Sequence, residues 1–222
     1  MILKKIKEFS VSKKSIIAWA SFFIILILIV DFFTVDKEYV YIDDLTNISA
    51  PIQSEASGGF DLKKGSWNVD ITYVAEYEVS GKVVNIHDYK GSSLNDKLSP
   101  VDVGLTWGEL ANDNQVRWYS TGNRFLYWKA SYEVINKLGG EDIISEQYSN
   151  NHLIPANDEI EKLVKEIEED DYVTIKGYLV NMYATKSDGS YRYWNSSTSR
   201  KDTGDGACEL IYVEDVKWLK EK

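Results

Sequence analysis

The stretch "ITYVAEYEVSGKVVNIHDY" (71–89) predicts the fold class of this chain. Tyr73 and Tyr77 fall on one face with other apolar residues, whereas Glu76 falls on the opposite face. Alternation of this kind is typical of a β-strand that is buried on one side. The run is long for a single strand, and Gly81 near its middle permits a bulge or a tight bend. We therefore expect a long and strongly curved strand.

Further strands are indicated on the carboxyl-terminal side of this stretch. Aromatic and β-branched residues are dense in three segments: "RFLYWKASYEVI" (124–135), "DYVTIKGYLVNMYA" (171–184) and "ACELIYVEDVKWL" (207–219). Residues of these types favour extended structure. After the second segment, "SDG" (187–189) predicts a tight turn into "YRYWN", and therefore a hairpin.

One helix is predicted between these strands, in "NDEIEKLVKEIEED" (157–170). Its apolar residues recur with helical spacing and form one stripe: Ile160, Leu163, Val164 and Ile167. Asn157 is a suitable N-cap, because its side-chain oxygen can accept a hydrogen bond from the first turn. Five or more curved strands with one inserted helix predict a mainly β fold, and an OB-like β-barrel fits best. An open α+β sheet packed on the helix is the alternative.

The composition narrows the functional classes. A length of 222 residues suits one ordinary domain with appendages, and an apolar share of 44% excludes wholesale disorder. The net charge of −10 argues against binding to a nucleic-acid backbone, which needs a positive surface. A single cysteine cannot form an internal disulfide, so we expect the hydrophobic core alone to stabilise the fold.

The amino terminus predicts a membrane anchor. Residues 1–14 carry five lysines, and residues 15–30 then run without a charge, with two phenylalanines extending the apolar run to residue 33. About 20 apolar residues are needed to cross a bilayer, so residues 15–33 are just long enough. A buried core helix and a cleaved signal peptide are the alternatives. The following "DFFTVDKEYV" offers no small-residue cleavage site, which favours an uncleaved anchor.

The charges on either side of this span predict its orientation. Lysines before it and acidic residues after it place residues 1–14 in the cytoplasm as a basic tail, and the rest of the chain outside the cytoplasmic membrane. Residues 34–66 have little periodicity and are interpreted as a stalk with one short strand at residues 39–42; residues 67–222 are interpreted as the compact domain. The chain has 25 Lys and Arg against 35 Asp and Glu, of which five Lys and two acids precede residue 34, leaving a net charge of −13 outside.

Several phrases in the external part carry a family resemblance. They are "SPVDVGLTWG" (99–108), "RFLYWKASYE" (124–133), "NHLIPANDEI" (151–160), "VTIKGYLVNM" (173–182) and "DTGDGACELIYVED" (202–215). Together they resemble a family of small bacterial proteins that are secreted or held by one amino-terminal helix, and that have no assigned activity. The resemblance covers roughly residues 70–219. It implies an extracytoplasmic bacterial setting and assigns no functional residue.

Cys208 is the first candidate for chemistry, with His152 and Arg200 as catalytic partners. A thiolate nucleophile needs a base or a positive neighbourhood to lower its pKa, and the chain has only two histidines. An anchored β-barrel with Cys, His and Arg also resembles the sortases, the cell-wall transpeptidases. However, Cys208 follows "GDGA" rather than the "TLxTC" phrase of sortases, and no Arg follows it. The alternatives are that Cys208 opens a strand as a small core residue, and that His152 is a loop residue at the helix entrance.

A second pattern predicts ligand binding. Arginines lie beside aromatic residues, and the candidate binding residues are Arg117, Trp118, Arg124, Trp128, Arg192 and Trp194. Arg with Trp and Tyr recognises anions, sugars and peptides, and OB-like barrels bind such ligands on one face. The alternative is ordinary packing on a strand surface. We therefore expect an envelope protein with a binding or accessory domain for a glycan or peptide, with a cysteine-dependent enzyme as the second interpretation.

The cysteine loop contains no recognisable metal site. "DTG" (202–204) resembles the aspartic protease motif, but a polar segment precedes it rather than an apolar strand. Asp202 and Asp205 are too few for a calcium loop, and no Cys or His pair has the spacing of zinc ligands. We predict a turn here, no metal and no cofactor. The lipid bilayer is the one partner that the sequence predicts directly, through residues 15–33.

Overall fold

The computed structural model describes residues 16, 19, 21–23, 35–202, 204 and 206–222. They divide into two units, residues 1–36 and residues 37–222. The predicted basic tail (1–14) and most of the predicted anchor (15–33) lie outside the described residues. Within the described part, no helix has the length and hydropathy needed to cross a membrane.

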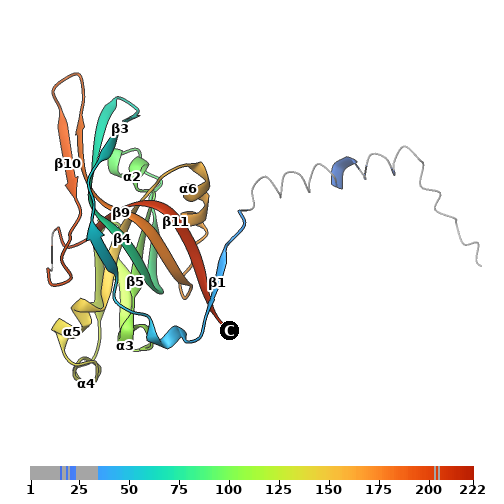
Figure 1. Ribbon diagram of the computed structural model, residues 1–222, viewed down its shortest axis with the longest axis vertical. Helices are drawn as coiled ribbons and strands as arrows, with labels where there is room; N and C mark the ends of the chain where they lie inside the picture. Colours follow the sequence, from blue (N-terminus) through green and yellow to red (C-terminus); the bar gives the residue numbers. More distant parts are fainter. Residues whose placement is uncertain (1–15, 17–18, 20, 24–34, 203, 205) are drawn as a thin grey trace, which may run out of the picture. The chain divides into compact units, whose positions relative to one another are not determined.

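The unit of residues 37–222 is mainly β, which confirms the predicted class, and its largest sheet has nine strands (Figure 1). The strands are β1 (Tyr39–Ile42), β2 (Ile52–Glu55), β3 (Gly59–Lys64), β4 (Trp67–Asp88), β5 (Val101–Thr106), β6 (Arg117–Ser120), β7 (Leu126–Lys129), β8 (Tyr148–Pro155), β9 (Tyr172–Thr185), β10 (Tyr191–Asn195) and β11 (Glu209–Glu221). The helices are η1 (Leu45–Asn47), α2 (Leu94–Leu98), α3 (Gly108–Ala111), α4 (Tyr132–Lys137), α5 (Glu141–Glu146) and α6 (Asp158–Lys165).

Strand β4 is the long curved strand that the alternation predicts. Its register shifts twice, between Tyr73 and Ala75 against β9, and between Val83 and Asn85 against β5. Such irregularities bend a strand and increase its twist. Gly81 lies between them and serves another purpose, because a Cβ there would come within 2.6 Å of a backbone oxygen of β5. The curvature therefore arises at the two irregularities, and the glycine permits close approach of the neighbouring strand.

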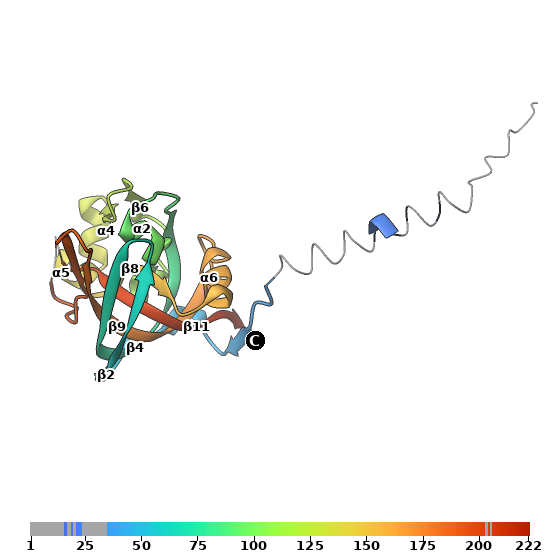
Figure 2. The same ribbon diagram turned by 90° about the horizontal axis from the view of Figure 1, so that it is seen from above.

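The strand pairings form a closed circuit. Strand β4 pairs with β5, and β5 pairs with β8, both antiparallel. Strand β8 then pairs in parallel with β11, β11 pairs antiparallel with β9, and β9 pairs back with β4. Helix α6 connects β8 to β9 and packs against β8 and β11 (Figure 2). This circuit brings strands from the middle and the end of the sequence side by side.

Most of the segment interpreted as a stalk, residues 37–66, is folded into the domain instead. Strand β1, at the predicted position, pairs with β11, while β3 and β2 pair with successive segments in the amino-terminal part of β4. On the edge of β4 that faces away from β9, β5 pairs only with residues 82–88. The backbone groups in the amino-terminal part of that edge are therefore left free by β5, and β2 and β3 pair with them. Phe60 and Leu62 also pack against the main core. The domain begins at Lys37 rather than at Trp67.

Two other local predictions are corrected by the structure. The segment 124–135 is a short strand, β7, followed by helix α4, because the Ser131 hydroxyl accepts a hydrogen bond from the Val134 backbone N–H and starts a helix there. Helix α6 is shorter than the 157–170 stretch, although Asn157 caps it as predicted.

Candidate functional site

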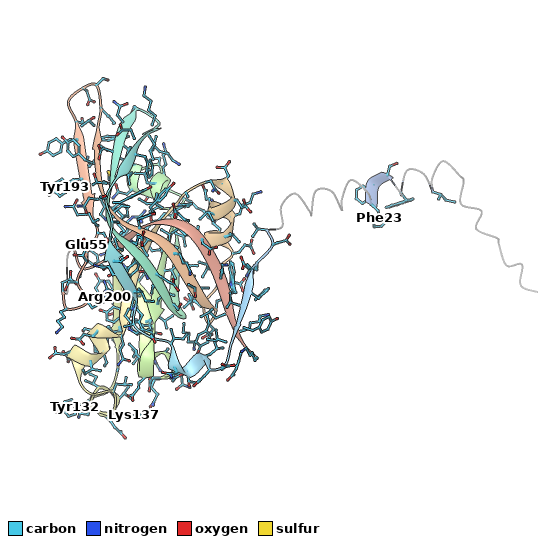
Figure 3. All side chains as sticks on the ribbon, viewed as in Figure 1. Phe23, Glu55, Tyr132, Lys137, Tyr193 and Arg200 are labelled. Carbon is cyan, nitrogen blue, oxygen red and sulfur yellow. The ribbon has the colours of Figure 1, made fainter. Side chains whose placement is uncertain are left out.

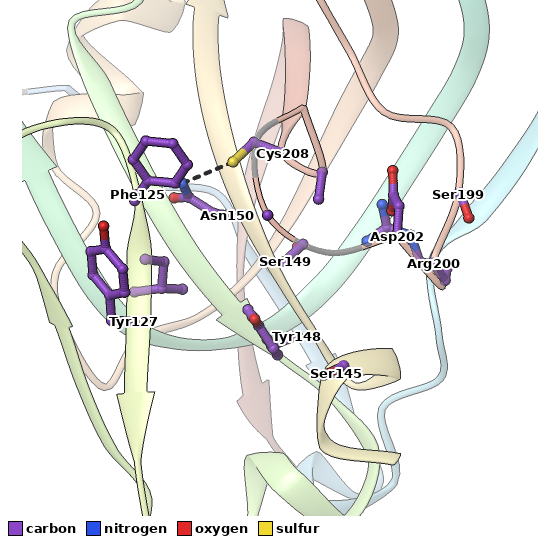
Figure 4. A pocket seen from close by; sticks show the side chains of 13 residues that line it. Phe125, Tyr127, Ser145, Tyr148, Ser149, Asn150, Ser199, Arg200, Asp202 and Cys208 are labelled. Carbon is purple, nitrogen blue, oxygen red and sulfur yellow. Dashed lines mark hydrogen bonds between the residues drawn. The ribbon is translucent and has the colours of Figure 1, made fainter. Parts of the chain in front are cut away.

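Cys208 lies one residue before β11, and its side chain is only partly buried. It lines two cavities. The first cavity has a volume of about 200 Å³ and also contains Asn150, Tyr148 and Arg200 (Figure 4). The second cavity has a volume of about 380 Å³ and also contains His152. Cys208 therefore borders two cavities and is not a fully buried core residue.

Three neighbouring strands place Asp102, His152 and Cys208 together. Asp102 on β5 is directly opposite His152 on β8 in the antiparallel pairing. His152 is in turn opposite Leu210 on β11, and Cys208 precedes Leu210 by two residues. Residues two apart on an extended chain lie on the same side. The pairing register thus brings together three side chains that are about fifty residues apart in sequence.

The His152 imidazole lies between a carboxylate and the thiol. His152 is 3% exposed and lies within β8, so it is not a loop residue at the helix entrance, the alternative given above. Its Nδ1 atom is 2.8 Å from Asp102 Oδ1, an ion-pair distance at which the ring N–H is not aligned with the oxygen. Burial alone lowers the pKa of His152, but the interactions of the ring with the Asp102 carboxylate and with Cys208 outweigh burial and raise the pKa above its ordinary value.

Arg124 holds Asp102 from the other side. Its Nη1 atom is 2.8 Å from Asp102 Oδ1, and its Nη2 atom is 3.0 Å from Asp96 Oδ1. The guanidinium also lies 3.8 Å from the Tyr89 ring centroid and 5.0 Å from that of Trp194. Arg124 has a φ of 65°, a left-handed backbone conformation that non-glycine residues seldom adopt and that typically costs about 1–3 kcal/mol. These contacts offset that strain and fix the carboxylate that faces His152.

Asn150 contacts the thiol directly. Its Nδ2 atom donates to Cys208 Sγ at 3.3 Å, the bond drawn in Figure 4, and to the Arg124 backbone oxygen at 2.8 Å. Asn150 lies on β8 two residues before His152, so the same face of one strand supplies both groups. The site therefore has a base and a neutral donor beside Cys208.

Arg200, the third catalytic candidate, lies on the first cavity, away from His152. It forms an ion pair with Glu209, whose side chain is fully buried at the start of β11. The three predicted catalytic residues thus surround Cys208 without forming one cluster: His152 is on the second cavity and Arg200 on the first. The guanidinium that acts on the Asp102–His152 pair is Arg124, which the sequence assigned to ligand binding.

The predicted binding residues do not share one groove. Arg124 and Trp194 meet on the second cavity. Trp118 and Trp128 are paired on the β6–β7 hairpin and pack against a small separate core, with Arg117 beside them on β6. Arg192 lies 5.8 Å from the ring centroid of Trp67, at the far end of the β9–β10 hairpin.

Sequence reasoning missed Asp102, Asn150, Asp96 and Tyr89. Asp102 sits in "SPVDVG", where a single acidic residue in an apolar run is the one visible signal. Within the described residues, no three His, Cys, Asp or Glu side chains are arranged to hold a metal ion. No protein-family model, curated protein or solved structure matches this chain.

Proposed function

We propose that residues 37–222 form an OB-like barrel that carries a cysteine-dependent acyl-transfer site. The circuit of pairings, β4–β5–β8–β11–β9 and back to β4, supports the first part, because an OB-fold is a five-stranded, partly open Greek-key barrel. The parallel β8–β11 pair and the helix between β8 and β9 fit the same interpretation.

One observation supports the chemistry: His152 lies between Asp102 and Cys208. A cysteine acts as a nucleophile when a nearby base takes its proton, and a third group orients that base. Here His152 is the base, and Asp102 holds its Nδ1 side, so that Nε2 is the nitrogen left for the thiol. When His152 takes the proton of the thiol, it leaves a thiolate beside an imidazolium, the reactive form of such a pair.

The class of reaction follows from these groups. A thiolate with a neighbouring proton donor can attack the carbonyl of an ester or an amide and release an alcohol or an amine. The resulting thioester is then resolved by water or by another nucleophile. We therefore propose a hydrolase or transferase that acts on acyl compounds.

Binding without chemistry is the second candidate, and the wall of the second cavity favours it. The Trp194 ring centroid is 4.9 Å from that of His152, with the two planes tilted by 46°, and Arg124 lies over the Trp194 ring. The adjacent Tyr193 is exposed on β10 and labelled in Figure 3. Aromatic side chains of this kind bind sugars and peptides. In this case Cys208 is dispensable for function.

The cellular setting remains part of the proposal. Residues 15–33 are proposed to anchor the chain in the cytoplasmic membrane, with residues 1–14 inside and the domain outside. The net charge of −13 beyond residue 33 favours an envelope peptide or glycan as the partner over nucleic acid.

The test of the enzyme proposal uses the full chain in detergent and p-nitrophenyl acetate as the acyl donor. We expect a rapid burst of p-nitrophenol, one per chain, and mass spectrometry should locate the acetyl group on Cys208. Cys208→Ser should abolish the burst. A wild-type chain that gives no burst and no acetylated Cys208 would leave the binding module as the better proposal.

A further inference from the structure

The two cavities at Cys208 are chemically different. Asn150 lines only the first cavity, and His152 lines only the second, whereas Cys208 and Phe125 line both. Both cavities therefore border Cys208, and one of them carries a neutral hydrogen-bond donor whereas the other carries the acid–base group. A substrate that spans the thiol will meet these two groups with different parts of its structure.

The Asn150 amide is well suited to stabilise negative charge at this point. One of its N–H groups is fixed on the Arg124 carbonyl at 2.8 Å, which orients the other toward Cys208 Sγ at 3.3 Å. Its backbone is held in the middle of β8 by the pairings with β5 and β11. A donor that is already oriented costs no reorganisation when charge develops beside it.

We propose that Asn150 donates a hydrogen bond to the oxyanion that forms when Cys208 attacks a carbonyl, with the acyl group in the first cavity and the leaving group in the second. This inference rests on the proposed acyl-transfer function. The leaving group must face His152, because that residue supplies its proton, and His152 is on the second cavity. The acyl group is then directed toward the first cavity, where Asn150 lies.

The reaction needs only the acyl substrate and then water or an amine. The thiolate sulfur forms a bond to the carbonyl carbon, and the C=O electron pair moves to the oxygen, which accepts from Asn150. When the carbonyl re-forms, the bond to the leaving oxygen or nitrogen breaks, and this atom takes the proton of the His152 imidazolium. Water or an amine then attacks the thioester, His152 takes its proton, and the C–S bond breaks to return the thiolate.

The cavity sizes predict which part of the substrate is small. The first cavity, of about 200 Å³, is below the usual range for sites that bind drug-sized molecules, about 300–1,000 Å³, whereas the second, of about 380 Å³, falls within it. The first cavity is lined by Tyr127, Tyr148 and several hydroxyl groups. We infer that the acyl group is short and polar and that the leaving group is the larger part.

The experiment compares two reactions of the same thiol in the full chain. Iodoacetamide alkylates the thiolate without forming an oxyanion, whereas p-nitrophenyl acetate reacts through one, and p-nitrophenolate leaves without needing a proton. Asn150→Leu removes the donor at similar volume, and Asn150→Ala is made alongside it. Asn136→Leu, which removes an exposed amide from helix α4 outside both cavities, is the matched control.

We expect Asn150→Leu to slow acylation about 100-fold, the usual loss for one oxyanion donor, and to slow alkylation only a few-fold. Equal slowing of both reactions, or no slowing of either, would overturn this inference while leaving the proposed function intact. A wild-type thiol that is inert to both reagents would overturn the proposed function and this inference with it.

A second measurement does not depend on the folding of the variants. Acetaldehyde adds to a thiolate to give a hemithioacetal, whose oxygen occupies the place of the oxyanion. We expect a crystal structure of this adduct to place that oxygen within about 3 Å of Asn150 Nδ2. An oxygen directed at His152 or at solvent instead would contradict the inference.

Discussion

Asp102 and His152 are directly opposite each other on antiparallel strands, and their Oδ1 and Nδ1 atoms are 2.8 Å apart in a buried site. The same Asp102 oxygen is also 2.8 Å from Arg124 Nη1. One carboxylate therefore holds a histidine and an arginine in place at once. Because His152 also interacts with Cys208, this pair connects the thiol to the cluster around Arg124.

The raised pKa of His152 predicts how stability depends on pH. A group whose pKa is higher in the folded chain contributes stability that is fully present below its unfolded pKa, about 6.5 for histidine. That contribution is lost as the pH rises through the folded pKa. Urea denaturation from pH 6 to pH 9 should show the free energy of unfolding falling over this window. The fall should be smaller in His152→Asn and retained in His87→Asn; an identical fall in all three would contradict the assignment.

Arg124 is predicted to be important for stability. Its removal leaves Asp102 and Asp96 without their common cation in a mostly buried site, and breaking a buried ion pair in this way typically costs about 3–5 kcal/mol. Relief of the left-handed backbone will return part of that cost in Arg124→Gly. We expect thermal or chemical denaturation to rank wild type first, then Arg124→Gly, then Arg124→Ala. Arg117→Ala, at an exposed arginine, is the control. If Arg117→Ala lost as much stability as Arg124→Ala, the prediction for Arg124 would be wrong.

The Arg200–Glu209 pair makes a double-mutant prediction. The Glu209 carboxylate is fully buried, so Arg200→Ala leaves it charged and unpaired at a cost of about 3–5 kcal/mol. Adding Glu209→Gln removes that charge and should recover part of the loss. Denaturant unfolding of the two single variants and the double variant gives the coupling energy. Simple additivity would mean that the two side chains do not interact.

The folded position of residues 37–66 predicts where the chain can be shortened. A chain that begins at Lys37 keeps β1, β2 and β3, whereas one that begins at Trp67 loses them and exposes the edges of β4 and β11. It also loses Phe60 and Leu62 from the core. We expect the shorter chain to melt at a lower temperature and to aggregate, because free sheet edges pair with other chains. Equal melting temperatures for the two chains would show that the segment is a linker after all.

Much of the fold could be predicted from local pattern. The alternation in 71–89 predicts β4, and the apolar stripe with the Asn157 cap predicts α6. Strand β5 is harder to predict from the sequence, because all its residues are buried and its polar and apolar residues do not alternate by face. Strands β2 and β3 are mostly exposed, so they resemble a polar linker until the edge of β4 is known.

The site could be predicted only in part, for a physical reason. Cys208 and His152 are rare residue types that stand out individually, but nothing local indicates that they meet. Asp102, His152 and Cys208 come together through the register of strands that are far apart in sequence, and a shift of one residue would turn each side chain to the other face. Arg124 could be predicted only as a binding residue. Its contact with Asp102 could not be predicted, because it depends on a backbone conformation that arginine seldom adopts.

Activation of Cys208 by His152 is measured by the pH dependence of the rate of alkylation of Cys208 by iodoacetamide, in the wild type and in His152→Ala. We expect His152→Ala to react at least about tenfold more slowly than the wild type at pH 7, and the difference to shrink above about pH 8.5, where a free thiol ionises without a base. His87→Ala should follow the wild type. Superimposable profiles for the wild type and His152→Ala would contradict the claim.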